Sequence, residues 1–258
     1  MTHENKRGRR LKAMQKFAKQ QRRQMRHLVR GWRSAIVDRT PRWMRRTLGP
    51  GVLYADMLLV DHGVFRLFYL NRHKLGKAAW RAAQPAPHQI KSAGRLGVRT
   101  IVNLRGERVC GGSWLEETAC ARHGLKLENY QVRSRAAPSR DEVLGARDLF
   151  RRIDYPILMH CKSGADRAGL MSALYLISME GVPVGEAKAQ LALKFGHIRQ
   201  SDTGILDYFF ERYLADSAQR PMPFFDWVAN VYDADELKRS FAAKGWANVI
   251  TNKILRRE

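Results

Sequence analysis

From residue 76 onward, short apolar runs alternate with amphipathic stretches. Runs of β-branched and aliphatic residues predict buried strands, and apolar positions spaced three or four apart predict helices. Strands are expected at 78–83, 98–104, 125–132 and 155–160. Helices are expected at 86–97, at 114–124 and after a capping box formed by Ser139 and Glu142. This alternation predicts an α/β fold with a parallel sheet covered by helices on both faces.

Beyond residue 170 the pattern becomes helical. Helices are expected at 170–180, 184–195 and 203–217, with shorter pieces from Phe224 to the end. A Pro-Met-Pro turn precedes that last part, and no stretch resembles a linker to an independent domain. We therefore expect one folded domain over residues 51–220. Residues 221–258 are expected to form a helical extension packed on its core.

The most apolar region, residues 51–70, precedes this pattern. It is interrupted by Asp56, Asp61, His62 and Arg66. A membrane span needs about 20 nearly charge-free residues. We therefore expect a buried helix that packs on the core and no transmembrane segment.

Charge sets the first fifth of the chain apart. The 258 residues carry a formal charge of +23, and residues 1–50 hold 16 Lys or Arg against Glu4 and Asp38. No apolar stretch typical of a secretory signal occurs there. Apolar residues recur at helical spacing, which predicts a basic amphipathic helical extension. They are Leu11, Met14, Phe17, Ala18, Met25, Leu28, Val29, Trp32 and Ile36.

Such an extension has several interpretations. It can lie on an anionic membrane through residues 10–46, with its cations on the headgroups. It can also pack on the domain, remain a solvated arm or bind nucleic acid.

The three cysteines exclude a disulfide scaffold, and their odd number suggests a reducing compartment. We expect a cytoplasmic protein, peripheral on the inner face of the membrane, with no stable nucleic-acid partner.

The candidate chemistry is concentrated at residues 160–169, His-Cys-Lys-Ser-Gly-Ala-Asp-Arg-Ala-Gly, directly after an apolar strand. A loop between a strand and a helix aims backbone N–H groups at one point, and the helix dipole adds positive charge there. These donors favour a thiolate at Cys161. Arg167 can hold phosphoryl oxygens as a planar fork. The expected phosphate-binding residues are Lys162, Ser163, Gly164, Ala165 and Ala168.

Two other interpretations of this segment are a buried cysteine followed by a chance arginine and a zinc site. A single His-Cys pair without a second pair at ligand spacing is weak support for zinc. We expect neither a metal nor a cofactor.

His160-Cys161 followed by Arg167 after an apolar strand resembles the signature of the cysteine-based protein tyrosine and dual-specificity phosphatase superfamily. The segments Trp-Arg-Ala-Ala-Gln-Pro and Val-Arg-Thr-Ile-Val-Asn-Leu-Arg-Gly-Glu resemble its atypical bacterial branch. The resemblance spans roughly residues 76–215. It implies a sheet of four to five parallel strands and a phosphocysteine intermediate on Cys161. It also implies that His160 supports the loop, or is a plain structural histidine.

The sequence departs from this family in two places. Many relatives carry Ser or Thr after the arginine, to assist loss of the cysteine, whereas this chain has Ala168. The usual acidic residue some 30 positions before the cysteine is also missing, because residues 129–139 contain no carboxylate. Asp166 resembles a loop aspartate of myotubularin-type phosphatases, which is proposed as the acid. Its alternative role is to orient Arg167 or the loop.

Arginines near the expected carboxyl edge of the sheet are further candidates. Arg105, Arg133 and Arg135 follow predicted strands and can read additional phosphates or a sugar acid, or they are solvated surface arginines. The preferred function is hydrolysis of a phosphomonoester on a membrane lipid or a lipopolysaccharide-type glycolipid. The alternatives are a phosphoprotein phosphatase and a non-catalytic phosphate- or nucleic-acid-binding protein.

Overall fold

The computed structural model describes residues 70–108 and 111–243. The basic extension predicted over residues 1–50 lies outside the described residues. So does the apolar helix predicted over residues 51–70, except for Leu70. Both stay predictions. In the described part of the chain, no helix combines the length and the apolar character needed to cross a membrane.

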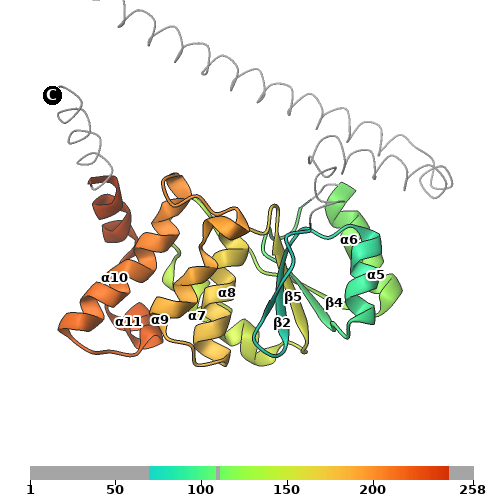
Figure 1. The fold of residues 1–258 in the computed structure, drawn as a ribbon, viewed down its shortest axis with the longest axis horizontal. Coiled ribbons are helices and arrows are strands. Elements are labelled where there is room, and N and C mark those ends of the chain that lie inside the picture. Colours follow the sequence, from blue (N-terminus) through green and yellow to red (C-terminus); the bar gives the residue numbers. More distant parts are fainter. Residues whose placement is uncertain (1–69, 109–110, 244–258) are drawn as a thin grey trace, which may run out of the picture. The chain divides into compact units, whose positions relative to one another are not determined.

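Within the described residues, five strands form one sheet in the order β1-β2-β5-β3-β4 (Figure 1). The strands are β1 His73–Leu75, β2 Ala79–Ala83, β3 Thr100–Asn103, β4 Lys126–Asn129 and β5 Ile157–Cys161. Strands β2, β5, β3 and β4 run parallel, and β1 pairs antiparallel with β2 at one edge. The predicted α/β fold is confirmed. The antiparallel edge strand was not predicted.

The register brings the carboxyl ends of the central strands together. Cys161, the last residue of β5, pairs with Ala83 of β2, and His160 pairs with Asn103 of β3. The loops that follow these strands therefore leave the sheet at the same edge. In open α/β sheets this edge is where ligands bind.

Helices cover both faces of the sheet (Figure 1). Helices α5 Pro87–Arg95 and α6 Gly111–His123 lie on one face, and α7 Arg140–Arg152 and α8 Asp166–Met179 lie on the other. Adjacent residues of β5 serve the two faces, because side chains alternate along a strand. Leu158 packs with Ile90 under α5, and Met159 packs with Phe150 under α7.

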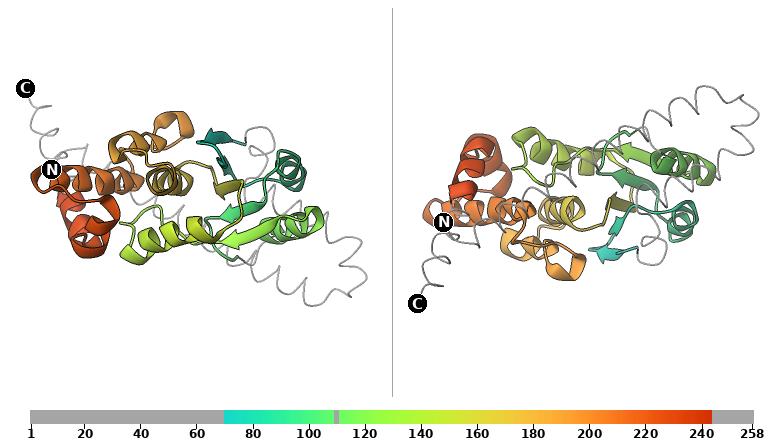
Figure 2. Two further views of the ribbon diagram at one scale, coloured as in Figure 1. Left: turned by 90° about the horizontal axis from the view of Figure 1, so that it is seen from below. Right: turned by 90° about the horizontal axis from the view of Figure 1, so that it is seen from above.

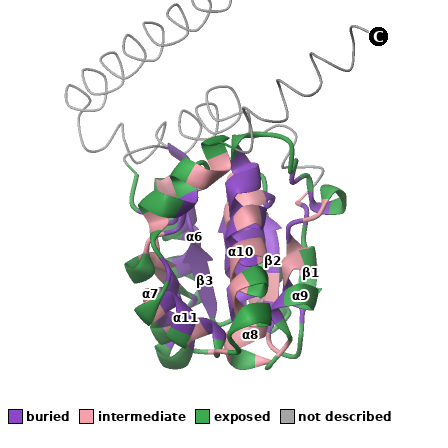
Figure 3. Cartoon of the chain, turned by 90° about the vertical axis from the view of Figure 1, so that its left-hand side faces the viewer, coloured by how far each residue is buried: buried purple, intermediate pink, exposed green. Residues whose placement is uncertain are grey.

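The chain then continues through helices that extend the larger core. These are α9 Val184–Ala187, α10 Ile205–Gln219 and α11 Phe224–Asn230, and residues 234–243 are also helical. Figure 2 shows α10 and α11 beside α7 and α8, at the end of the molecule away from α5. Phe209 of α10 contacts the rings of Trp227 and Tyr232. Figure 3 shows buried residues along the strands and along much of α10.

The continuous helix predicted over residues 184–195 is wrong. The structure has α9, then 3₁₀ turns η1 Lys188–Gln190 and η2 Leu193–Phe195. Between these turns Ala192 is extended, with φ −117° and ψ 155°. The physical reason is a tertiary contact: Arg81 of β2 takes both the main-chain and the side-chain oxygen of Gln190. The backbone follows that anchor instead of continuing the helix.

Candidate active site

The turn from β5 into α8 forms a loop around Cys161. Cys161 ends the strand and is 2% exposed, and α8 begins at Asp166. The first bond inside the helix joins Gly169 N to Ala165 O at 2.8 Å. The preceding N–H groups of the first turn have no acceptor within the helix and carry the positive end of its dipole. The loop therefore offers anion-binding donors beside a cysteine.

Gly164 gives the loop its shape. Its φ is +76°, a left-handed conformation that residues with a side chain rarely adopt. A Cβ at this position would also lie 2.7 Å from the backbone of Ala82 and Ala83 in β2. Glycine is required for both reasons, and it lets the loop pack directly on the neighbouring strand.

A buried arginine of β2 holds the loop from behind. Arg81 is fully buried, and its Nη2 donates to Gly164 O at 2.7 Å and to Ala165 O at 3.0 Å. Its Nη1 donates to Gln190, and the guanidinium lies 4.0 Å from the centre of the Phe195 ring. Burial lowers the pKa of Arg81 to about 10, and the charges of Cys161 and Asp166 oppose that lowering. Arg81 therefore remains a cation at neutral pH.

Asn71, which lies just before β1, also holds the loop. Its Nδ2 donates to Ser163 O at 3.0 Å and to Phe195 O at 2.9 Å. The C=O of one residue and the N–H of the next point in opposite directions across a trans peptide. Because Asn71 and Arg81 hold the carbonyls of residues 163–165, the N–H groups of Gly164, Ala165 and Asp166 point to the opposite side of the loop. That side can hold an anion.

Arg167 follows in the first turn of α8 and is partly exposed. Among the described residues, its guanidinium has no hydrogen-bond or ion-pair partner. Lys162 is partly exposed and Ser163 exposed, so both lie at the surface of the loop. Ala168 is buried, and its carbonyl accepts a hydrogen bond from Ser172. The residues predicted for the phosphate loop are therefore contiguous, with Cys161 inside and Arg167 open to a ligand.

His160 is part of a buried polar chain behind the loop. Its Nδ1 lies 3.3 Å from Cys161 O, and its Nε2 pairs with the carboxylate of Glu116 in α6. Glu116 also accepts from Gln84 Nε2 at 3.0 Å, and Gln84 accepts from the guanidinium of Arg105. Every member of this chain is at most 5% exposed. This series of hydrogen-bonded side chains links the ends of β2, β3 and β5 to α6.

The three arginines predicted to read further phosphates lie in different environments. Arg105 is buried in the chain behind His160, so it is neither a solvated arginine nor open to a second phosphate. Arg133 forms a two-pronged contact with Glu142, the capping residue of α7, with Nη2 to Oε2 at 2.9 Å. Arg135 is exposed. The structure gives Arg105 and Arg133 partners inside the protein.

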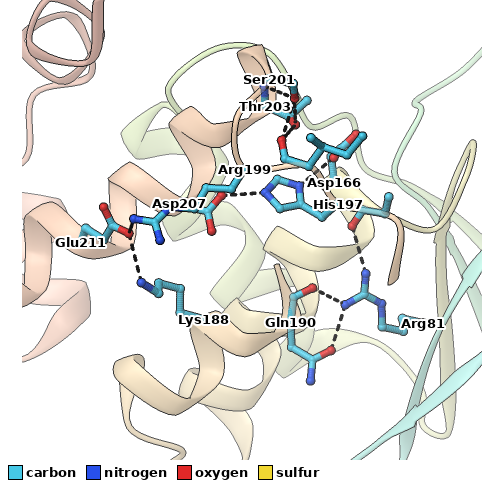
Figure 4. A network of polar contacts seen from close by, with 12 residues as sticks. Arg81, Asp166, Lys188, Gln190, His197, Arg199, Ser201, Thr203, Asp207 and Glu211 are labelled. Atoms are coloured by element: carbon cyan, nitrogen blue, oxygen red, sulfur yellow. Dashed lines mark hydrogen bonds and ion pairs between the residues drawn. The ribbon is translucent and has the colours of Figure 1, made fainter. Parts of the chain in front are cut away.

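Asp166 contacts a histidine from a later segment. Its Oδ1 lies 2.8 Å from His197 Nδ1, and the Nε2 of that ring lies 2.6 Å from Asp207 Oδ2 (Figure 4). The side chain of Asp166 is 27% exposed, whereas that of His197 is fully buried. Asp166 can therefore meet a ligand and an internal partner at the same time.

The remaining described cysteine lies away from this chemistry. Cys120 is buried in α6, and burial, with the nearby charge of Glu116, raises the pKa of its thiol to about 12. It packs as a small apolar side chain. Over residues 70–108 and 111–243, no group of three or more His, Cys, Asp and Glu side chains is arranged to hold a metal ion.

Sequence reasoning missed the residues that support the loop from a distance. Arg81 was visible only as a charged residue inside an apolar strand, a pattern that signals a buried partner. Glu116 gave a similar signal within α6. Asn71 gave none, because its φ of +47° and its contacts arise from the tertiary fold.

The parallel sheet with a cysteine-and-arginine loop at its carboxyl edge is the arrangement of the cysteine-based phosphatases. A family described as "DSP-PTPase phosphatase fused to NAD+ Kinase" matches residues 70–205, just over half of the chain. The chain belongs to this DSP-PTPase family.

Individual relatives are more distant. The dual specificity protein phosphatase TpbA of Pseudomonas aeruginosa is 26% identical over 117 residues, 43% of this chain and 49% of the relative. The chain thus spans about half the length of the curated relatives it matches. The crystal structure of TpbA has a TM-score of 0.47 at 19% identity, covering 67% of this chain and 91% of that one. The structure of PTPMT1 has a TM-score of 0.43 at 19% identity, covering 58% and 99%.

Proposed function

We propose that this chain hydrolyses phosphomonoesters through a phosphocysteine intermediate on Cys161. One arrangement carries the proposal: Cys161 lies inside a loop whose amides are turned inward by Arg81 and Asn71, with Arg167 open beside it. This geometry suits a phosphoryl group, whose oxygens need several fixed donors and a cation. The nucleophile lies at the base of that cradle.

In the first half of the reaction, the thiolate of Cys161 attacks phosphorus and the bond to the leaving oxygen breaks. Arg167 and the loop amides stabilise the charge on the remaining phosphoryl oxygens. Asp166 gives a proton to the leaving oxygen. In the second half, water attacks phosphorus, the sulfur–phosphorus bond breaks, and phosphate leaves. Forming and then hydrolysing a covalent intermediate is nucleophilic catalysis.

The substrate that we favour is a phosphate on a membrane lipid or a lipopolysaccharide-type glycolipid, met at the membrane surface. The basic first fifth of the chain supports this choice. So does the segment that carries His197. There Leu193 is 76% exposed beside Lys194, and Ile198 is 53% exposed beside Arg199. Exposed apolar side chains next to cationic ones in this segment suit an amphiphilic anion.

A phosphoprotein is the second candidate substrate. The curated relative is named a dual specificity protein phosphatase, which supports this alternative. A non-catalytic phosphate-binding or nucleic-acid-binding role is disfavoured. Such a role needs no nucleophile, whereas the chain carries both Cys161 and Arg167 in one loop.

The test is phosphate release from a panel of aryl phosphates, phosphopeptides, phospholipids and lipopolysaccharide-type glycolipids. Cys161→Ser should abolish turnover while vanadate binding stays measurable. Arg167→Lys should lose most of the rate, because a point charge cannot replace a planar fork. Cys120→Ala and Arg99→Lys are the matched controls and should keep activity.

Three outcomes would argue against the proposal. Full activity of Cys161→Ser would exclude the cysteine mechanism. Loss of wild-type activity on chelation, restored by a divalent ion, would indicate metal-dependent chemistry. A rate on phosphopeptides well above that on every lipid would select the second substrate class.

A further inference from the structure

His197 is a buried histidine that the reaction scheme leaves unassigned. It lies between η2 and the 3₁₀ turn η3 Asp202–Gly204, and its side chain has no exposed surface. The fold brings its ring between two carboxylates, one of them in the phosphate loop (Figure 4).

Both ring nitrogens face acceptors. An ionised carboxylate only accepts hydrogen bonds, and an imidazole donates from both nitrogens only when it is protonated. The distances of 2.8 Å to Asp166 and 2.6 Å to Asp207 therefore suit an imidazolium. Burial opposes that charge, but the hydrogen bonds and charges of the two aspartates outweigh it and raise the pKa of His197 to about 9.

The segment around His197 is itself fixed. Arg199 and Lys188 both pair with Glu211 of α10, and Ser201 caps η3 by accepting from Thr203 N (Figure 4). Asp207, on the first turn of α10, is 4% exposed. A ring held in such a frame can orient the group it contacts. That group is Asp166, the partly exposed carboxylate of the phosphate loop.

We propose that His197, backed by Asp207, is a positioning residue that orients Asp166 and stabilises the negative charge that Asp166 acquires during catalysis. The inference rests on the proposed function, because Asp166 is the proton donor in that scheme. It extends the active site to α10 and to a residue 31 positions after Asp166.

The proton balance is as follows. The thiolate, the phosphomonoester dianion and protonated Asp166 give phosphocysteine, the free alcohol and ionised Asp166. Water, phosphocysteine and ionised Asp166 then give hydrogen phosphate, the thiolate and protonated Asp166. His197 keeps its proton throughout and faces the ionised form that exists between the two steps. The proton that Asp166 gives away is carried on Oδ2, because Oδ1 accepts from His197.

Two substitutions separate the contacts of the ring. In His197→Asn, the side-chain amide can replace Nδ1 and keep a neutral hydrogen bond to Asp166. In His197→Gln, the longer amide can replace Nε2 and keep the tie to Asp207 and α10. Neither amide carries a positive charge. Exposed His123 at the end of α6 supplies the matched control, His123→Gln.

We expect both His197 variants to lower kcat on an alkyl phosphate by at least tenfold with little change in KM. The loss on an aryl phosphate with a good leaving group should be several times smaller, since such a group departs without a proton. Adding His197→Gln to Asp166→Asn should cause little further loss. Wild-type kcat on the alkyl substrate should show a further fall as the pH rises through about 9, where His197 loses its proton and no longer faces Asp166 with a positive charge.

The charged groups that raise the pKa of His197 and set this limb are Asp166 and Asp207, which both contact the ring. The limb should be absent in Asp166→Asn and in both His197 variants. If a His197 variant fails to fold, the pH dependence of kcat in wild type and in Asp166→Asn still tests the inference. Both of these proteins carry His197, and they differ only in the group that it contacts.

Other outcomes would overturn the inference. Equal losses on alkyl and aryl phosphates, or losses that multiply with those of Asp166→Asn, would show that His197 only holds the loop. A limb near pH 9 that persists in Asp166→Asn would show the same. Failure of the proposed function looks different: wild-type protein would then release no phosphate even from the aryl substrate, or Cys161→Ser would remain active.

Discussion

Arg81 shows how much of the active-site loop depends on one side chain. Its guanidinium joins the carbonyls of Gly164 and Ala165 to Gln190, and its Cζ lies over the Phe195 ring. A planar group with several donors can hold acceptors on different segments at the same time. The inward direction of the loop amides is a consequence of this clamp.

We expect Arg81→Lys to lower kcat on an aryl phosphate by at least tenfold. The free energy of unfolding should fall by about 1–3 kcal/mol, because a single amine leaves some of the buried acceptors unpaired. Steady-state kinetics and urea unfolding measure the two effects. Arg95→Lys, at the exposed end of α5, is the control and should change neither. Wild-type kcat in Arg81→Lys would show that the loop holds its shape without the clamp.

At this scale the sequence predicts local placement better than distant support. The structure brings Cys161, Gly164 and Arg167 into one loop, as their spacing in the sequence predicts, and their chemical roles stay predictions. Arg81 contacts residues 83 and 109 positions away, and Asn71 contacts one 92 positions away. No local pattern encodes such partners, and Arg105 was misplaced for the same reason.

Among the elements, helix α7 begins at a capping box that the sequence alone predicts. Ser139 Oγ accepts from Glu142 N at 3.1 Å, and Glu142 Oε2 accepts from Ser139 N at 2.6 Å. Glu142 also binds Arg133, so the cap fixes the preceding loop as well. Its carboxylate is held ionised: these hydrogen bonds lower the pKa of Glu142 although burial opposes them.

Ser139→Ala should lower the free energy of unfolding by about 1 kcal/mol, the usual value of an N-cap side chain. Phosphate release should stay within about twofold of wild type, because the hydrogen bonds of Ser139 go to Glu142 and Val143 of the helix that it caps. Urea unfolding and steady-state rates are the measurements. Ser92→Ala, at an exposed position inside α5, should change stability by less than about 0.5 kcal/mol. An equal effect of both substitutions would contradict a capping role.

The type of an element was predicted correctly where the spacing of apolar residues agrees with the capping and turn residues at its ends, as for β5 and α7. The segment after α9 shows the opposite case. Its apolar spacing favoured one helix over 184–195, but the buried contact between Arg81 and Gln190 divides it into short turns. Tertiary contacts override local propensity there. Strand β1 was missed because its three residues are too few to show a period.

For the whole molecule, the charge distribution makes a separate prediction about location. We expect the full chain to sediment with anionic vesicles and hardly with neutral ones, because the cations of residues 1–50 attract anionic headgroups. Binding should weaken with salt, since the Debye length falls from about 10 Å at 0.1 M to about 3 Å at 1 M. A chain that starts at Gly51 should lose this binding and keep its activity on an aryl phosphate.

Two results would contradict this interpretation. If the shortened chain is insoluble or inactive on the aryl phosphate, the basic extension belongs to the folded core. If the full chain binds duplex DNA as tightly as anionic vesicles, the extension binds polyanions in general. In that case the lipid substrate loses its main support.

The contacts of Asn71 have a mechanical consequence. Its side-chain amide donates to Ser163 O in the phosphate loop and to Phe195 O at the end of η2. Arg81 joins the same two segments through Ala165 O and Gln190. A shift of the segment that leads to His197 is therefore transmitted directly to the loop that binds phosphorus, and the two segments behave as one rigid part.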